Sequence, residues 1–360
     1  MSQFKINSIT DKTGISGPVI AGVSTNNSTG CMIIPAGPTE HRGGRGRAVF
    51  SGGYKYSSPY NIGNVMQFVQ ISTLGNTADF GDAVVTASVR GTAASATIGL
   101  FAGGYNTSTN AIDYVIMSSS GGSLDWGDLS SDPTLNDDTN NMKRYLPMGL
   151  SNITRGYFVG GTKAGGGFNQ FQNIDLVNFS SKGNTSLFGF LNKRRGQGGS
   201  FASPTRGVFG GGRTKDPDVS PDITVDFITL STSGEETKFG DLTAARDYPS
   251  GASSSTRGLF AGGSPDPSSA ANVSDIIDYV TIATESIAID FGNLTAARHV
   301  GSASNNTRAI NGGGYVSSAL VNTIDYVTIA TTGNAVDFGD LSTAATKMTP
   351  CSDAHGGLIQ

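Results

Sequence analysis

The most suggestive chemical motif in the sequence is the triplet Asp-Phe-Gly, which begins at Asp79, Asp290 and Asp337. In protein kinases the aspartate of this triplet binds Mg²⁺, but kinase chemistry also requires a glycine-rich phosphate loop, a strand lysine and a His-Arg-Asp catalytic loop. We find none of these partner motifs in the sequence, and the triplets recur at regular spacing. They therefore predict a structural repeat rather than a phosphotransferase.

The three histidines, His41, His299 and His355, do not stand at metal-ligand spacing from one another or from a cysteine. No set of Tyr, His and Cys residues suggests a copper oxidase, and the SxDxGxTW box of sialidases is absent from the sequence. Carboxylates are numerous, but they recur with the repeat and give no unique pair for acid–base catalysis. The sequence thus predicts a non-enzymatic protein with no cofactor and no metal site.

Calcium binding is an open alternative, because calcium prefers oxygen ligands from acidic loops. Solvated turns explain the same carboxylates more simply. The carboxylates concerned stand in segments expected to be loops, with Gly and Asn nearby: Asp137, Asp138, Asp216, Asp218 and Asp222.

Charge and cysteine content exclude further classes of protein. A net charge of −4 argues against a nucleic-acid partner, and we interpret the basic stretch Arg42–Arg47 as a linker rather than a phosphate-binding turn. Two cysteines, Cys31 and Cys351, are too few for a disulfide scaffold, and whether they pair stays open. The sequence shows neither a signal peptide nor an apolar run of membrane-spanning length, so we expect synthesis in the cytoplasm and no membrane insertion.

A segment ending in Gly-Gly recurs six times, mostly about 50 residues apart. Glycine at these positions is expected to let backbones approach closely. The segments are Arg47–Gly53, Ile98–Gly104, Arg155–Gly161, Arg206–Gly212, Arg257–Gly263 and Arg308–Gly314. The glycines assigned to the repeat are Gly52, Gly53, Gly103, Gly104, Gly160, Gly161, Gly211, Gly212, Gly262, Gly263, Gly312 and Gly313.

Each Gly-Gly is followed by a variable loop, an apolar strand such as Ile324–Ile329 (IDYVTI), a short turn and a second strand with an aromatic residue. We expect the aromatic side chains to fill the space between neighbouring units. The recurring aspartates, such as Asp278, are expected to bond locally with Arg155, Arg206, Arg257 and Arg308. The aromatic residues are Phe80, Trp126, Phe188, Phe239, Phe291 and Phe338.

Four short antiparallel strands per unit cannot bury both sheet faces alone, so the units must stack, and a closed ring is the usual result. The order of features resembles the kelch repeat, in which a late aromatic is followed by an arginine. Arg90, Arg246 and Arg298 occupy the arginine position, whereas Thr346 and the third unit depart from it. The resemblance implies an all-β fold, a six-bladed kelch-like β-propeller over residues 46–360 with an N-terminal extension. A seventh blade built partly from Val19–Pro35 is the alternative.

The first unit has little room for its own first strand, because few residues separate His41 from Arg47. The tail Lys347–Gln360 aligns with the region where a first strand should lie. We therefore expect residues 347–360 to supply a strand that closes the first blade and removes the open sheet edges. Residues 1–45 would then form a separate arm for attachment.

The loops after Gly-Gly and the connections between units vary, and they should emerge on one face. Variable loops on a rigid scaffold are typical of recognition surfaces. The candidate binding residues, expected to be exposed there, are Tyr60, Lys143, Arg144, Tyr145, Phe168, Phe171, Lys193 and Arg194.

A second resemblance spans nearly the whole chain. The segment Gly17–Arg47 and the motif IDYVTIATTGNAVDFGDL are similar to virion-associated propeller proteins of tailed phages that infect marine cyanobacteria and related hosts. This implies a virion protein of the tail, fibre, baseplate or capsid surface, bound to other virion proteins through residues 1–45. Its propeller would recognise a host glycan, a receptor or a neighbouring subunit. A free protein- or glycan-binding module and, remotely, a propeller hydrolase or oxidase are the alternatives.

Overall fold

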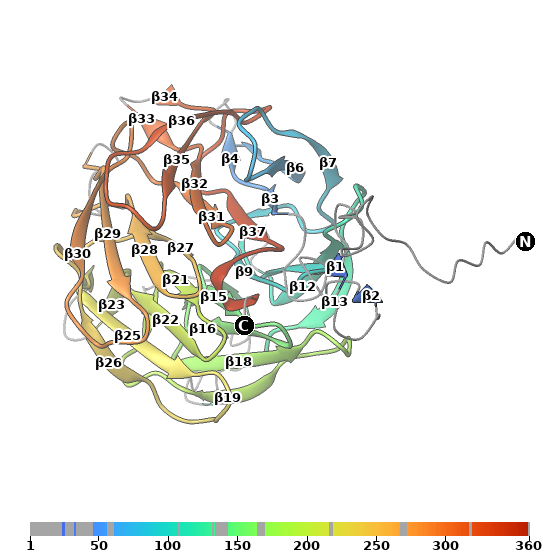
Figure 1. Ribbon diagram of the computed structural model, residues 1–360. Helices are drawn as coiled ribbons and strands as arrows, with labels where there is room; N and C mark the ends of the chain where they lie inside the picture. The colour runs from blue at the N-terminus through green and yellow to red at the C-terminus, as the bar shows by residue number, and fades with distance from the viewer. Residues whose placement is uncertain are drawn as a thin grey trace, which may run out of the picture.

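The computed structural model describes residues 46–55, 61–106, 109–131, 133, 143–163, 170–215, 219–266, 272–316 and 319–358, together with two short strands at 24–25 and 32–33. The described chain is built from β-strands, with one 3-10 turn, η1 (Gly356–Leu358), and no α-helix in these ranges. The expected all-β fold is therefore confirmed (Figure 1).

Six antiparallel sheets of four strands each make up most of the described chain, numbered here as sheets 1 to 6. Sheet 1 contains β37 (Thr349–Ser352), β3 (Arg47–Ser51), β6 (Val65–Gln70) and β7 (Ala78–Asp82); sheet 2 contains β9 (Gly91–Ala94), β10 (Ile98–Ala102), β12 (Ala111–Ile116) and β13 (Leu124–Asp128). Sheet 3 contains β15 (Met148–Ser151), β16 (Arg155–Val159), β18 (Asn173–Asn178) and β19 (Ser186–Phe190); sheet 4 contains β21 (Gly199–Ala202), β22 (Arg206–Gly210), β25 (Thr224–Thr229) and β26 (Thr237–Asp241). Sheet 5 contains β27 (Ser250–Ser253), β28 (Arg257–Ala261), β29 (Ile276–Thr281) and β30 (Ile289–Asn293); sheet 6 contains β31 (Gly301–Ser304), β32 (Arg308–Gly312), β35 (Thr323–Thr328) and β36 (Val336–Asp340).

Short strands pair within the loops that follow Gly-Gly and join several of these loops to the connections between sheets. In the segment 1–45, β1 (Ser24–Thr25) pairs with β2 (Met32–Ile33), and the rest of the region proposed as an arm or a seventh blade lies outside the described residues. The other pairings are β4 (Tyr54–Lys55) with β5 (Asn61–Ile62), β8 (Ala87–Ser88) with β11 (Tyr105–Asn106), β14 (Arg144–Tyr145) with β17 (Thr162–Lys163), β20 (Arg195–Gly196) with β23 (Arg213–Lys215), β23 with β24 (Val219–Pro221), and β33 (Tyr315–Val316) with β34 (Ala319–Leu320).

The first strand of each sheet lies at the centre of the molecule, and the sheets radiate outward from it (Figure 1). These inner strands contact one another in the order β9, β15, β21, β27, β31 and β37, and β37 also contacts β9. Because β37 pairs with β3, residues near both ends of the described chain share sheet 1. The arrangement is compatible with a β-propeller.

Six apolar clusters fill the spaces between neighbouring sheets. One of them joins sheet 6 to sheet 1 through Phe338, Ile324 and Phe50. The repeated aromatics are buried in these clusters and meet a second ring edge-on, as in Tyr326–Phe338 at 5.9 Å between ring centroids. Each sheet therefore buries its two faces against its two neighbours.

The glycine after each repeated aromatic permits backbone contact between neighbouring sheets. Gly81 has φ +137°, and a Cβ there would lie 2.5 Å from the carbonyl oxygen of Gly121 in the next sheet. Gly339 contacts Gly75 in the same way, so this contact also joins sheet 6 to sheet 1. Any other residue at these positions would push two sheets apart.

The Gly-Gly assignment needs one correction. In sheet 6 the pair with positive φ is Gly313 (φ 69°) and Gly314 (φ 126°). Gly312 lies inside β32, paired with Ile324. The run of three glycines at 312–314 hid the shift by one residue in the sequence.

A buried arginine–aspartate pair recurs in five of the six sheets. In sheet 5, Arg246 bonds with Asp278 at 2.5 Å and donates to the carbonyl oxygens of Gly262 and Ile276. The pairs are Arg90–Asp113, Arg144–Asp175, Arg195–Asp226, Arg246–Asp278 and Arg298–Asp325.

The arginines expected to bond with these aspartates have another role. Arg257 lies over the ring of Tyr279, 4.4 Å from its centroid, and donates to the carbonyl oxygen of Ile329 in sheet 6. Arg206 and Arg308 make equivalent contacts. These arginines therefore bridge neighbouring sheets rather than hold the aspartates.

The C-terminal segment after β37 closes one end of the centre. Gly356–Leu358 is buried and contacts β15, β21 and β27. The Nε2 atom of His355 lies 2.9 Å from the carbonyl oxygen of Ala94, and its Nδ1 atom accepts a hydrogen bond from the backbone of Gly357. With Nδ1 as acceptor, the ring is the neutral tautomer that donates from Nε2. Burial accordingly lowers the pKa of His355 to about 4.

Removal of β37 tests whether this strand holds sheet 1 against its neighbours. A chain that ends at residue 348 loses the inner strand of sheet 1 and exposes apolar surface on two neighbouring sheets. We expect it to lose the cooperative thermal transition seen by circular dichroism. A chain ending at residue 358 is the control and should melt like the full chain. Equal melting of the 348 and 358 chains would show that β37 does not hold the sheets together.

The neutral His355 predicts a pH effect on stability. Its folded pKa lies below the unfolded value of about 6.5, so the unfolded state binds the extra proton and stability falls as the pH drops from 6.5 towards 4. We expect this residue to contribute on the order of 3 kcal/mol to that loss. Urea denaturation at pH 7 and pH 4.5 should show a smaller pH-dependent loss for His355→Asn than for the natural chain. Equal losses would contradict the assignment, because other buried groups titrate alike in both proteins.

Candidate functional site

The sequence-predicted binding residues are divided between surface and interior. Lys143 and Lys193 are exposed, and Tyr145 is half-buried in β14. Arg194 is half-buried and donates to the carbonyl oxygen of Gln170 at 2.9 Å. Tyr60 and Phe168 lie outside the described residues.

The interpretation of Arg144 and Phe171 as exposed binding residues is wrong, because both side chains are fully buried. Arg144 bonds with Asp175, donates to Asn173 Oδ1 at 2.9 Å and lies over the Phe171 ring at 5.2 Å. Arg144 follows Trp126 and fills the arginine position of the second unit, where the longer interval after the aromatic concealed it. The third unit, which was expected to lack this arginine, has Arg195 there, after Phe188 and bonded with Asp226.

A polar and aromatic depression lies at the centre of the loop-bearing end. It has a volume of about 130 Å³ and opens where the inner strands begin. Six residues, each two positions before an inner strand, line it, and we call this group the central mouth: Val89, Leu146, Gln197, Tyr248, His299 and Lys347.

The backbone of the central mouth is strained. Five of its six residues have φ between 51° and 68°, a region that non-glycine residues rarely occupy. Val89, at φ 51°, is β-branched and therefore especially unfavourable there. Such strain is concentrated at functional sites in many proteins. The six side chains also differ in type, whereas the surrounding repeat positions are alike.

An arc of three tyrosines lies beside the central mouth. Tyr54, Tyr105 and Tyr145 come from β4, β11 and β14, and neighbouring rings are 6.0 and 5.4 Å apart between centroids. Tyr105 is 44% exposed. The ammonium group of Lys347 lies 5.8 Å from the Tyr54 ring and 4.7 Å from the Tyr248 ring, which connects the arc to the central mouth.

A buried carboxylate stands next to these residues. Asp247 Oδ2 accepts from Arg213 Nη2 at 2.7 Å and Nε at 3.1 Å. With its amide nitrogen turned towards the carboxylate, Gln197 donates to both Asp247 oxygens at 2.7 and 2.9 Å. Burial raises the pKa of Asp247 to about 6, against the opposing effect of Arg213.

Lys347 has no carboxylate at ion-pair distance among the residues that the structure describes. Burial lowers the pKa of its ammonium group, and Arg213 adds to this effect, while Asp247 opposes it. Within the described ranges, the central mouth therefore holds a lysine whose ammonium group contacts no carboxylate.

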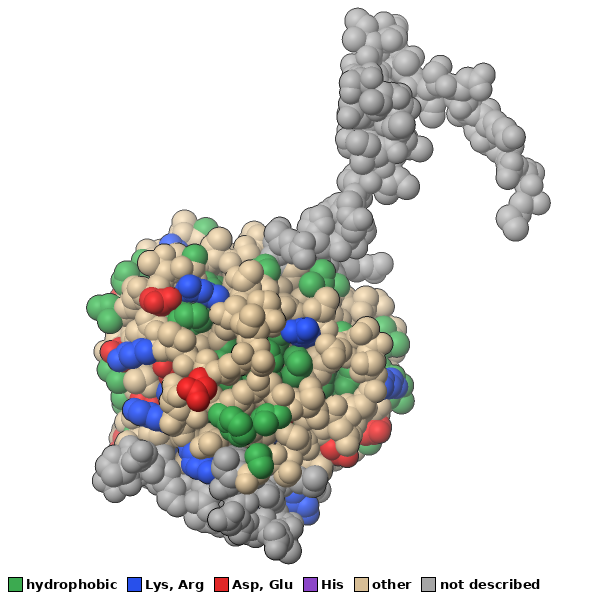
Figure 2. Space-filling view, turned by 90° about the horizontal axis from the view of Figure 1, so that it is seen from below, with side chains coloured by type: hydrophobic (Ala, Val, Ile, Leu, Met, Phe, Trp, Pro, Cys, Tyr) green, Lys and Arg blue, Asp and Glu red, His purple; other side chains and the backbone are tan. Residues whose placement is uncertain are grey.

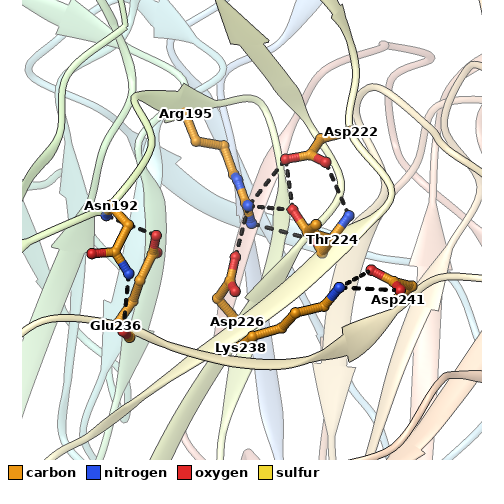
Figure 3. Close-up of polar contacts among 8 residues, drawn as sticks. All are labelled: Asn192, Arg195, Asp222, Thr224, Asp226, Glu236, Lys238 and Asp241. Carbon is orange, nitrogen blue, oxygen red and sulfur yellow. Dashed lines mark hydrogen bonds and ion pairs between the residues drawn. The ribbon is translucent and has the colours of Figure 1, made fainter. Parts of the chain in front are cut away.

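A second group of charged residues lies in sheet 4 (Figure 3). Arg195 bonds with Asp226 at 2.7 Å and with Asp222 at 3.0 Å. Glu236 accepts from the backbone of Asn192 at 2.8 Å, and burial raises its pKa to about 7. This group is an extended form of the recurring arginine–aspartate pair.

The calcium alternative has no support in the described part of the chain. There, no group of three or more His, Cys, Asp or Glu residues is arranged to bind a metal ion. Asp222 bonds with Arg195 instead, and the other four proposed carboxylates lie outside the described residues. Cys351 is buried and forms no disulfide with a described residue, and Cys31 lies outside the described ranges.

The outer side seen from below Figure 1 carries positive and negative side chains interspersed with apolar ones (Figure 2). The described residues on that side do not form a large patch of one charge. No helix in the described ranges is long and apolar enough to cross a membrane.

No family model matches the sequence, and no curated protein matches it either.

Sequence reasoning missed the central mouth, because its six residues share no side-chain type and so do not stand out as a repeated position. A usable signal was present in two units, where proline follows the mouth residue at Leu146 and Tyr248. Tyr54 and Tyr105 directly follow a Gly-Gly pair and could have been found there.

The burial of Arg144 gives a prediction with an adjacent control. We expect Arg144→Ala to lower the free energy of unfolding by about 3–5 kcal/mol, because it leaves the buried Asp175 carboxylate unpaired. The neighbouring substitution Lys143→Ala changes an exposed side chain and should stay within about 0.5 kcal/mol. Urea denaturation measures both. Similar changes in the free energy of unfolding for the two variants would contradict the buried position of Arg144.

Proposed function

We propose that this chain is a six-bladed kelch-type β-propeller that acts as a non-enzymatic recognition protein of a phage particle. The cyclic order of contacts among six inner strands supports six blades. Apolar packing and the glycine contact between sheets 6 and 1 support a closed ring.

The proposed recognition role rests on one contrast: the repeated positions have similar residues in every unit, whereas the central mouth has a different residue in each. Repeated aromatics, glycines and arginine–aspartate pairs are buried between strands and sheets. By contrast, the central mouth has a different side chain from each blade and lies next to the tyrosine arc, of which Tyr105 is exposed. Selection of a partner would use these non-repeated groups, because the repeated groups are buried in the packing of the sheets.

The virion role is supported by the resemblance of Gly17–Arg47 and of the repeat to virion-associated propeller proteins of tailed phages. Residues 1–45 would attach the chain to other virion proteins. The propeller would then present its loop-bearing face to a host surface glycan or receptor, or to a neighbouring subunit.

A free interaction module is the second candidate function. It is favoured by the location of the central mouth, which lies wholly within the propeller and does not require residues 1–45. Particle association separates the two roles: mass spectrometry of purified particles detects the chain only if it is a virion component.

Binding of the labelled full chain to host cells tests recognition directly. We expect the double variant Tyr105→Ala, Tyr145→Ala to lose at least tenfold in cell binding, because it removes two rings of the arc beside the central mouth. Leu187→Ala is the control: Leu187 is 47% exposed, close to the 44% of Tyr105, but stands on the outer strand β19. Equal cell binding by both variants would contradict recognition at this face.

A further inference from the structure

We propose that the central mouth binds an acidic saccharide, with the carboxylate of one sugar unit on Lys347 and the sugar rings along the tyrosine arc. The inference rests on the recognition role proposed above and names the class of its ligand.

The charge of the central mouth favours an anion. Arg213 is matched by Asp247, whose two oxygens also accept from Gln197. Among the residues that the structure describes, two positive groups, Arg213 and Lys347, thus lie near the Asp247 carboxylate, which already accepts from Arg213 and Gln197. Lys347 therefore holds the excess charge.

The aromatic surroundings of Lys347 strengthen the preference of the central mouth for an anion. Its ammonium group lies against the rings of Tyr54 and Tyr248, where less water surrounds it than on an open surface. A charge in such a place attracts an anion more strongly than one in bulk water. An incoming carboxylate would complete the ion pair that the described protein residues do not provide.

The tyrosine arc fits a sugar better than a simple ion. A pyranose ring has an apolar C–H face that packs on aromatic rings and hydroxyl groups at its edge that form hydrogen bonds. Tyrosine offers both an apolar ring and a polar hydroxyl. Tyr54, Tyr105 and Tyr145 follow one another around the opening, so consecutive sugar units could lie along them.

The shape of the centre limits how a chain of sugars can enter. A volume of about 130 Å³ accommodates roughly one sugar unit or its charged part. At the opposite end of the inner strands, His355 and η1 contact β9, β15, β21 and β27. The ligand therefore enters from the loop-bearing face and ends at the mouth, which suits a terminal or branching acidic sugar.

Isothermal titration calorimetry on the full chain tests the proposal with matched pairs of probes. The probes are 3′-sialyllactose against lactose, and trigalacturonate against its methyl ester. We expect at least one acidic probe to bind, at least tenfold more tightly than its neutral counterpart, and more weakly as the salt concentration rises.

Substitutions of Lys347 then test whether the carboxylate of the acidic probe binds at this residue. Lys347→Met should reduce affinity for the acidic probe at least tenfold, and Lys347→Arg should restore part of it. Lys182→Met is the control, because Lys182 also lies over a tyrosine ring, 4.1 Å from the centroid of Tyr114, but outside the central mouth. If Lys347→Met unfolds the chain, Tyr105→Ala and the salt dependence on the natural protein still decide the question.

Three results would overturn the proposal: no binding of either acidic probe, equal affinity for acidic and neutral probes, or full acidic affinity in Lys347→Met. These results are separable from failure of the recognition role. Host-cell binding that depends on the tyrosine arc but not on acidic sugars would contradict only the acidic saccharide as the ligand. Acidic-sugar binding without host-cell or particle association would contradict only the proposed role on a phage particle.

Discussion

The whole structure depends on one constraint: a four-stranded sheet with two apolar faces cannot be stable alone. Each sheet is covered by its two neighbours, and the clusters between them use the same aromatic position around the molecule. Close approach at the outer strands requires glycine, as at Gly81 and Gly339, where a side chain would meet the next backbone. The same contact joins the last sheet to the first, so no sheet is left with an uncovered face.

The buried arginine–aspartate pairs attach the connections between sheets to the strands of the sheets. A buried ion pair offsets its desolvation only when its remaining hydrogen-bonding groups find partners. Here the guanidinium groups also donate to carbonyl oxygens, as Arg246 does to Gly262 and Ile276. Sheet 1 uses a neutral arrangement instead, in which Gln67 accepts from Thr77 and Ser342. The exception falls in the sheet where the C-terminal strand β37 pairs with β3.

The residues that pack the sheets together and the residues proposed for recognition occupy different positions of the same repeat. The aromatic positions are similar in every unit, and the inner strands are built mostly from small residues, because each sheet must pack against two similar neighbours. The residues two positions before the inner strands project into the central opening and are not subject to that requirement. They vary from Val89 to Lys347, and five of the six have positive φ values.

The sequence by itself determined the all-β class, the four-strand unit and the aromatic positions, because repetition makes a local pattern visible without knowledge of its neighbours. It also indicated a strand in the tail, where β37 lies. Only the tertiary structure decided that Arg144 and Phe171 are buried and that Gly313–Gly314 is the sixth glycine pair. It alone brought Tyr54, Arg213, Asp247 and Lys347 together. Those residues come from different sheets, and their proximity arises from convergence of the sheets on one centre, which no local sequence pattern records.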